Sequence, residues 1–174
     1  MYGSNLCLNL NHIDKIPAFY NPPGARGEDT FFACATVSKK TKVASIPVYH
    51  FHDGFLKYTE IMNGEFPKSL RKINVKEQNI KSRFLKATLG WIKYKPLLLY
   101  IKDRENYKNE IKSMVKKLQE IVPKLNDIFN DNCFTSLLEE LEKYDKNVDQ
   151  HYNDYIRTNE IWNALKGKIN NEVN

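Results

Sequence analysis

Hydrophobic and polar residues follow different patterns in the two halves of the chain, and the first half predicts a mixed α/β structure. Leucines alternate with other residues over residues 6–10, which is typical of a strand. A loop rich in proline and glycine is expected over residues 20–27, followed by a short helix over residues 30–38. Residues 42–51 are mostly apolar and predict a second strand, in which Pro47 suits a sheet edge.

In the second half, apolar residues recur at helical spacing. Four amphipathic helices are predicted, over residues 76–93, 103–122, 124–144 and 147–169. Pro96 and Pro123 are expected to interrupt helical structure, because proline lacks a backbone N–H and clashes with the preceding turn. We therefore expect an α/β domain in residues 1–65 and a helical extension in residues 66–174.

The composition is that of a folded protein of a reducing compartment. The 174 residues are 41% hydrophobic and 12% aromatic, which is enough to build a core. The first residues lack the basic and apolar stretches of a secretory signal, and no apolar run is long enough to cross a bilayer. Cys7, Cys34 and Cys133 are widely spaced and are expected to be buried free thiols. We expect a cytoplasmic location.

The net charge of +6 comes from one segment of the chain. Residues 68–104 hold eleven basic and two acidic residues, and residues 81–102 alternate lysine and arginine with aromatic and aliphatic residues. This stretch fits a helix that packs on its own domain and exposes a solvated basic face. It also fits attachment to an anionic membrane surface, on the inner face of the cell membrane. Nucleic-acid binding is the weaker alternative, because no recognised binding module accompanies the charge.

Two adjacent carboxylates, Glu28 and Asp29, stand where the loop meets the predicted helix, with Arg26 two residues before the first. Acidic residues in a first helical turn commonly cap free N–H groups and favour the helix dipole. The same position suits a general base, because a helix start holds a carboxylate rigidly and keeps it ionised. Arg26 could then meet an anionic leaving group.

Two histidines, His50 and His52, lie at the end of the second predicted strand. At strand spacing they share one face, about 6.5–7 Å apart along the strand. They could bind a metal that neutralises a diphosphate leaving group. The alternative is a pair that is solvated or bonded within the structure, since histidine is often only partly buried.

The stretch GSNLCLNLNHIDKIPAFYNPPGARGEDTFF, followed by VASIPVYHFHDGF, resembles the C-terminal half of a family 2-like bacterial glycosyltransferase of the GT-A fold. The resemblance covers about residues 3–60 and implies a Rossmann-like sheet. It implies that Asp29 is the catalytic base and that Glu28 orients the acceptor or its loop. It also implies substrate contacts for Asn5, Arg26 and Gly27.

The resemblance also implies a divalent cation, Mn²⁺ or Mg²⁺, bound by the histidine downstream of the Gly-Glu-Asp motif. That histidine corresponds to His52 or His50, and the phrase FHDGF favours His52. Such enzymes hold the cation and the nucleotide with an Asp-x-Asp motif in an upstream half, and this sequence contains no Asp-x-Asp. We therefore expect a chain that starts inside the catalytic domain, that is inactive alone, and that needs a partner carrying the other half.

The predicted function is thus part of an inverting, metal-dependent transferase. It would move a sugar from a nucleotide-diphosphate donor to a glycan or lipid-linked acceptor, in surface polysaccharide biosynthesis. The alternative is a non-catalytic helical protein that binds a partner or a membrane surface.

Overall fold

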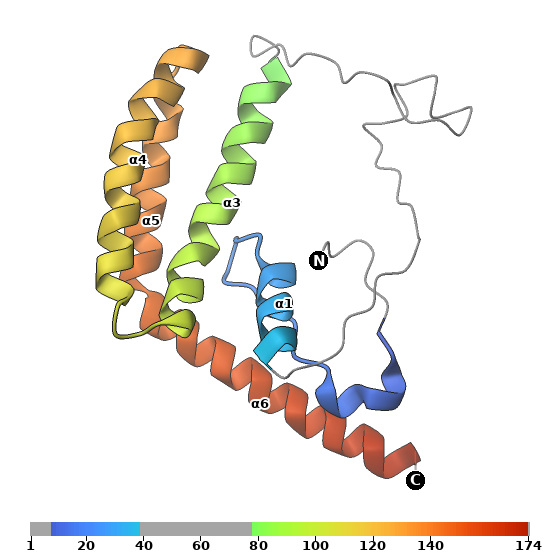
Figure 1. The fold of residues 1–174 in the computed structure, drawn as a ribbon. Coiled ribbons are helices and arrows are strands. Elements are labelled where there is room, and N and C mark those ends of the chain that lie inside the picture. Colours follow the sequence, from blue (N-terminus) through green and yellow to red (C-terminus); the bar gives the residue numbers. More distant parts are fainter. Residues whose placement is uncertain (1–7, 39–77, 174) are drawn as a thin grey trace, which may run out of the picture.

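The computed structural model describes residues 8–38 and 78–173, and these residues form helices without a β-strand (Figure 1). The elements are η2 (Leu10–Lys15), α1 (Glu28–Ser38), α3 (Gln78–Lys102), α4 (Tyr107–Phe129), η4 (Asn132–Thr135), α5 (Ser136–Lys146) and α6 (Val148–Val173), where η2 and η4 are 3₁₀ helices. The predicted α/β, Rossmann-like fold is wrong: the described residues are 82% helical and contain no strand. The second predicted strand, over residues 42–51, lies outside them.

The described part of the first predicted strand is not extended sheet structure. Leu10 begins η2, and the Asn9 side chain accepts a hydrogen bond from the Asn11 backbone N–H at 3.1 Å. Asparagine caps helical turns in this way, and the cap competes with strand pairing. An alternation of three leucines is too short to predict a strand reliably, and here the Asn9 cap favours a helical turn instead.

Helices α3, α4 and α5 lie side by side and enclose the main apolar core (Figure 1). On α4, Tyr107, Ile111, Leu118 and Val122 are buried at helical spacing. The buried residues of this core are Ile92, Tyr100, Tyr107, Ile111, Leu118, Val122, Phe134, Leu137, Leu141 and Val148.

Pro96 and Pro123 lie inside helices that the sequence predicted to end before them, at residues 93 and 122. α3 continues through Pro96 to Lys102, and α4 continues through Pro123 to Phe129. A proline within a helix costs about 3 kcal/mol. At Pro96 the packing of the next residue, Leu97, which is fully buried, offsets that cost. The helix predicted over residues 124–144 is instead the end of α4, then η4 and α5.

α4 ends at a left-handed asparagine that caps it. Asn130 adopts a left-handed conformation with φ of 47°, and its N–H bonds to the carbonyls of the last helical turn. Asn130 is therefore a C-terminal cap that turns the chain into η4. Asp131 follows, caps η4 through a 2.8 Å bond from the Cys133 N–H, and pairs with Lys81 of α3.

α6 runs across the ends of the other helices and extends past them (Figure 1). Its N-terminal part contacts α3 and α5, and its C-terminal part packs against η2. Its 26 residues make it about 39 Å long. The predicted domain boundary at residue 65 falls outside the described residues, so the division into residues 1–65 and 66–174 stays a prediction.

Two cysteines are described, and both are free. Cys34 is exposed on α1 and Cys133 is half-buried. The expected burial of Cys34 is therefore wrong, because the apolar face of α1 is made by Phe31 and Phe32, both buried.

Candidate functional site

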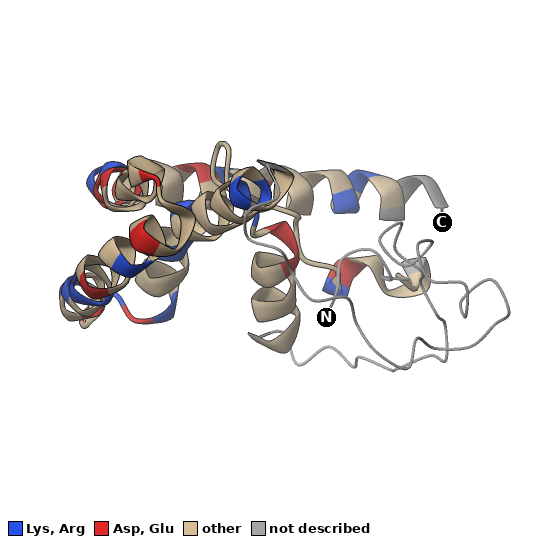
Figure 2. Cartoon of the chain, turned by 90° about the horizontal axis from the view of Figure 1, so that it is seen from above, with Lys and Arg blue, Asp and Glu red and all other residues tan. Residues whose placement is uncertain are grey.

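The adjacent carboxylates lie in the first turn of α1, where the helix begins two residues earlier than predicted. The Phe31 N–H donates to the Gly27 carbonyl at 2.9 Å, which is the first bond of the helical ladder. In Figure 2 the start of α1 is acidic and the rest of that helix carries no charged residue; the two acidic residues are Glu28 and Asp29. Glu28 is exposed, and Asp29 is half-exposed with the Thr30 hydroxyl 3.5 Å from its Oδ1.

A hydrogen-bonded loop leads into this helix start. The Asn21 side chain donates to the Ala25 carbonyl at 2.6 Å and accepts from the Gly27 N–H at 2.9 Å. The Ala25 N–H donates to the Pro22 carbonyl at 2.9 Å, and Gly24 supplies the positive φ of 68° that the turn requires. Asn21 thus fixes the loop immediately before the two carboxylates.

Two glycines allow this loop to touch α3 closely. A Cβ on Gly27 would lie 2.6 Å from Cγ of Tyr94, and a Cβ on Gly90 would lie 2.6 Å from Cγ of Arg26. Real Cβ atoms do not approach other atoms this closely. Between the two contacts, the Arg26 N–H donates to the Gly90 carbonyl at 3.1 Å. The loop is therefore joined to α3 through backbone as well as side chains.

Aromatic rings hold α1 in place. Phe31 is buried and meets Tyr20, Tyr94 and Tyr155 at ring-centroid distances of 5.9, 6.2 and 6.1 Å. Phe32 is also buried and stacks on Phe19 at 4.3 Å. These rings fix the buried face of α1, so the carboxylates at its start have a defined position.

The loop is also tied to α5 and α6. The Tyr144 hydroxyl donates to the Pro23 carbonyl, and the Tyr20 hydroxyl donates to the His151 carbonyl at 3.1 Å. Burial, with a smaller effect of Asp154, raises the pKa of Tyr20 to about 12, so this hydroxyl remains a donor.

His151 is a buried histidine at this junction. Its ring lies 5.0 Å from that of Tyr144, and its Nδ1 is buried without a hydrogen-bond partner among the described residues. Burial lowers the pKa of the His151 imidazole, although Asp154 opposes this effect. The side chain is therefore held in its neutral form.

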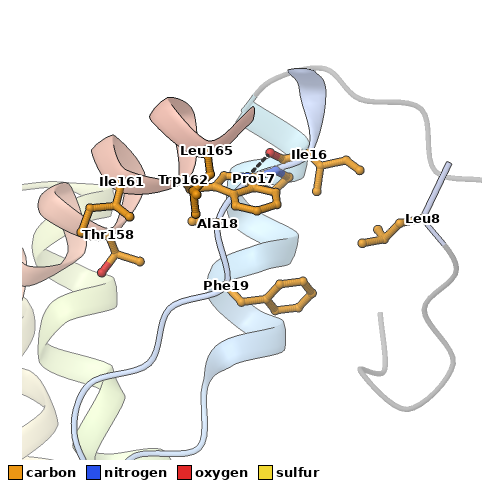
Figure 3. Close-up of a pocket in the computed structure, with 9 residues that line it drawn as sticks. All are labelled: Leu8, Ile16, Pro17, Ala18, Phe19, Thr158, Ile161, Trp162 and Leu165. Carbon is orange, nitrogen blue, oxygen red and sulfur yellow. Dashed lines mark hydrogen bonds between the residues drawn. The ribbon is translucent and has the colours of Figure 1, made fainter. Parts of the chain in front are cut away.

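An apolar groove of about 320 Å³ separates the N-terminal segment from the far end of α6 (Figure 3). A 2.8 Å bond from Trp162 Nε1 to the Ile16 carbonyl joins two of the residues that line it. Lys166 is buried beside it and donates to the carbonyls of Asp14 and Ile16 at 3.0 and 3.3 Å. The lining residues are Leu8, Ile16, Pro17, Ala18, Phe19, Thr158, Ile161, Trp162 and Leu165.

The structure brings four of the seven predicted site residues together: Arg26, Gly27, Glu28 and Asp29 are consecutive at the start of α1. Asn5, His50 and His52 lie outside the described residues. Within residues 8–38 and 78–173, no three His, Cys, Asp or Glu side chains meet in a way that could hold a metal ion. The cation and the roles of all seven residues stay predictions.

Sequence reasoning missed the residues that position the loop. Asn21 could have been found, because asparagine before Pro-Pro-Gly is typical of a turn. Gly90 and Tyr144 carried no such signal, since their partners are 64 and 121 residues away.

Comparison of the chain with models of protein families, with curated proteins and with solved structures finds no match. The case for a function therefore rests on the residues themselves.

Proposed function

We propose that the chain supplies the acceptor-activating base of a glycosyltransferase that uses a nucleotide-diphosphate sugar. The observation that carries the proposal is the Gly27-Glu28-Asp29 motif at a helix start that α3 and α5 hold in place. α3 contacts it through Gly90 and Tyr94, and α5 contacts the preceding loop through Tyr144. The proposal does not depend on a β-sheet.

The position of Asp29 suits proton abstraction. As the acceptor hydroxyl attacks the anomeric carbon, its proton passes to a carboxylate oxygen of Asp29, and the bond from that carbon to the diphosphate breaks. In-line attack inverts the configuration at the anomeric carbon. A general base must lie within reach of the hydroxyl, and Asp29 is half-exposed in the first turn of α1. Glu28, one residue earlier and exposed, would contact the acceptor.

The donor and the cation need other residues. The sequence has no Asp-x-Asp, and the predicted ligands His50 and His52 lie outside the described residues. We therefore assign the described residues to the acceptor side and the nucleotide-binding part to residues outside them. Arg26 would face the departing diphosphate, because its backbone is fixed on α3 while its side chain is exposed.

The test is transfer of labelled sugar in extracts of source cells whose own copy of the gene has been deleted. Extracts are supplied with the purified chain, a panel of uridine, guanosine and thymidine diphospho-sugars, and Mn²⁺ or Mg²⁺. Asp29→Asn should lower transfer by about 10²–10⁴-fold, the usual contribution of a general base. Asp14→Asn, which alters an exposed carboxylate of η2, should leave transfer unchanged.

Two results would contradict the proposal at different levels. Normal transfer with Asp29→Asn would show that Asp29 is not the base, and would leave the transferase function itself standing. Transfer that does not depend on adding the chain, for every donor tested, would remove the transferase function.

A further inference from the structure

One face of α3 is exposed although it carries large apolar side chains. Trp91 is 59% exposed, whereas its neighbour Ile92 is buried in the core. At 100° per residue, five of the residues of α3 between Phe84 and Lys102 fall within an arc of about 60°. These are Phe84, Trp91, Lys95, Leu98 and Lys102, and we call this arc the Trp91 face.

The Trp91 face combines apolar surface with unpaired positive charge. Trp91 and Phe84 are both exposed, and Leu98 is half-exposed. Elsewhere on α3, Lys81 pairs with Asp131, and Lys93 lies 3.6 Å from a carboxylate oxygen of Glu140. In contrast, Lys95 and Lys102 have no ion-pair partner among the described residues.

Further basic residues lie beside this face. Arg83 and Lys86 are exposed on α3 and likewise have no carboxylate partner within the described part of the chain. The ion pairs therefore neutralise the lysines that face the bundle and leave those that face solvent. Of the basic residues on α3, Arg83, Lys86, Lys95 and Lys102 are therefore the ones that an external anion could meet.

We propose that the Trp91 face binds the surface of an anionic lipid membrane. Tryptophan favours the headgroup region, where its ring is buried and its N–H remains hydrogen-bonded. Lysines around it are attracted to anionic headgroups. Such binding would be peripheral, since none of the described helices is long and apolar enough to cross a membrane. The proposal is independent of the glycosyltransferase function.

A membrane fits this face better than a nucleic acid. Phosphate-backbone binding gains its strength from many basic contacts, whereas the Trp91 face holds only two lysines among three large apolar side chains. A lipid surface can bury those apolar groups as well as pair with the charges.

The test is sedimentation of the full chain with phosphatidylcholine vesicles that do or do not contain phosphatidylglycerol. The assay is run at about 50 mM and about 500 mM salt, because salt screens exposed charges. We expect sedimentation with anionic vesicles at low salt, little at high salt, and none with phosphatidylcholine alone. In Trp162→Phe protein, where Trp91 is the remaining tryptophan, emission should shift to shorter wavelength on binding.

Matched variants locate the surface. Lys95→Gln with Lys102→Gln should weaken binding about 30-fold, the combined effect of two lysines near an anionic surface. Lys112→Gln with Lys116→Gln removes the same charge from exposed positions on α4 and should have a much smaller effect. Trp91→Ala should weaken binding at both salt concentrations, with the circular dichroism of the chain unchanged.

The proposal fails if the chain does not sediment with anionic vesicles at low salt. It also fails if the two lysine pairs weaken binding equally, because net charge alone would then be responsible. Binding to a single- or double-stranded oligonucleotide in preference to the vesicles would assign the face to nucleic acid instead.

Discussion

The α3–α5 bundle and the N-terminal segment, residues 8–38, are held by different kinds of contact. The bundle encloses fully buried leucine and phenylalanine side chains that pack against one another. The N-terminal segment is attached chiefly by single hydrogen bonds to backbone carbonyls, by stacked rings and by two glycine contacts. The stability of the bundle should therefore depend on apolar volume, and the attachment of the segment on shape and polar pairing.

The largest expected effect comes from a cavity in the bundle. Leu141→Ala removes a fully buried side chain of α5 and should lower the free energy of unfolding by about 2–5 kcal/mol. Urea denaturation followed by circular dichroism measures it. Ile128→Ala on α4, where the side chain is 58% exposed, is the control and should cost less than about 1 kcal/mol. Similar losses in both variants would show that the bundle core is not where the structure places it.

A smaller and more local effect is expected at the loop. Gly27→Ala places a Cβ against the ring of Tyr94 and should cost about 1–3 kcal/mol, because loop and helix must separate. Hydrogen exchange should rise in residues 8–38 and remain unchanged in α4 and α5. The matched change Gly167→Ala, in α6 and with open space around it, should be neutral or stabilise by about 0.5–1 kcal/mol. Uniformly faster exchange in the Gly27 variant would mean that the two regions are not distinct.

The smallest expected effect is a pH dependence at the junction of the two regions. His151 titrates below its ordinary pKa of 6.5 in the folded chain, so the unfolded chain takes up a proton first as the pH falls. Stability should therefore fall below about pH 6.5 and level off once the folded histidine is protonated as well. His151→Gln should flatten this part of the curve, measured as melting temperature against pH. An unchanged curve would show that His151 is not buried in neutral form.

The presence of a helix was predictable from the sequence where the amphipathic pattern was long. The residues at which each helix begins and ends were not predictable. The four buried residues of α4 recur at regular spacing, so that helix was found although its end was misplaced. Pro96 was misread because local propensity disfavours proline within a helix, while the burial of Leu97 arises from tertiary packing. A weak three-leucine alternation likewise predicted a strand that the Asn9 cap excludes.

For the candidate site, the sequence identified the two carboxylates but not the residues that hold them in position. Glu28 and Asp29 were predicted at a helix start, and the structure places them there. Their positioning depends on Gly90, Tyr144 and His151, which are distant in sequence and have ordinary neighbours. Contacts of that kind arise from tertiary packing and have no local pattern by which to predict them.

The paired glycine contacts also constrain how the sequence can vary. The Arg26 side chain covers Gly90, and the Tyr94 ring covers Gly27, so each glycine is tolerable to replace only if the residue covering it becomes smaller. The effects of substitution at these four positions are therefore non-additive, since residues in contact couple energetically. A larger residue at Gly27 therefore needs a smaller one at Tyr94, and a larger residue at Gly90 needs a smaller one at Arg26. Because Arg26 and Gly27 immediately precede α1, the sequence at the start of that helix is constrained in the same way.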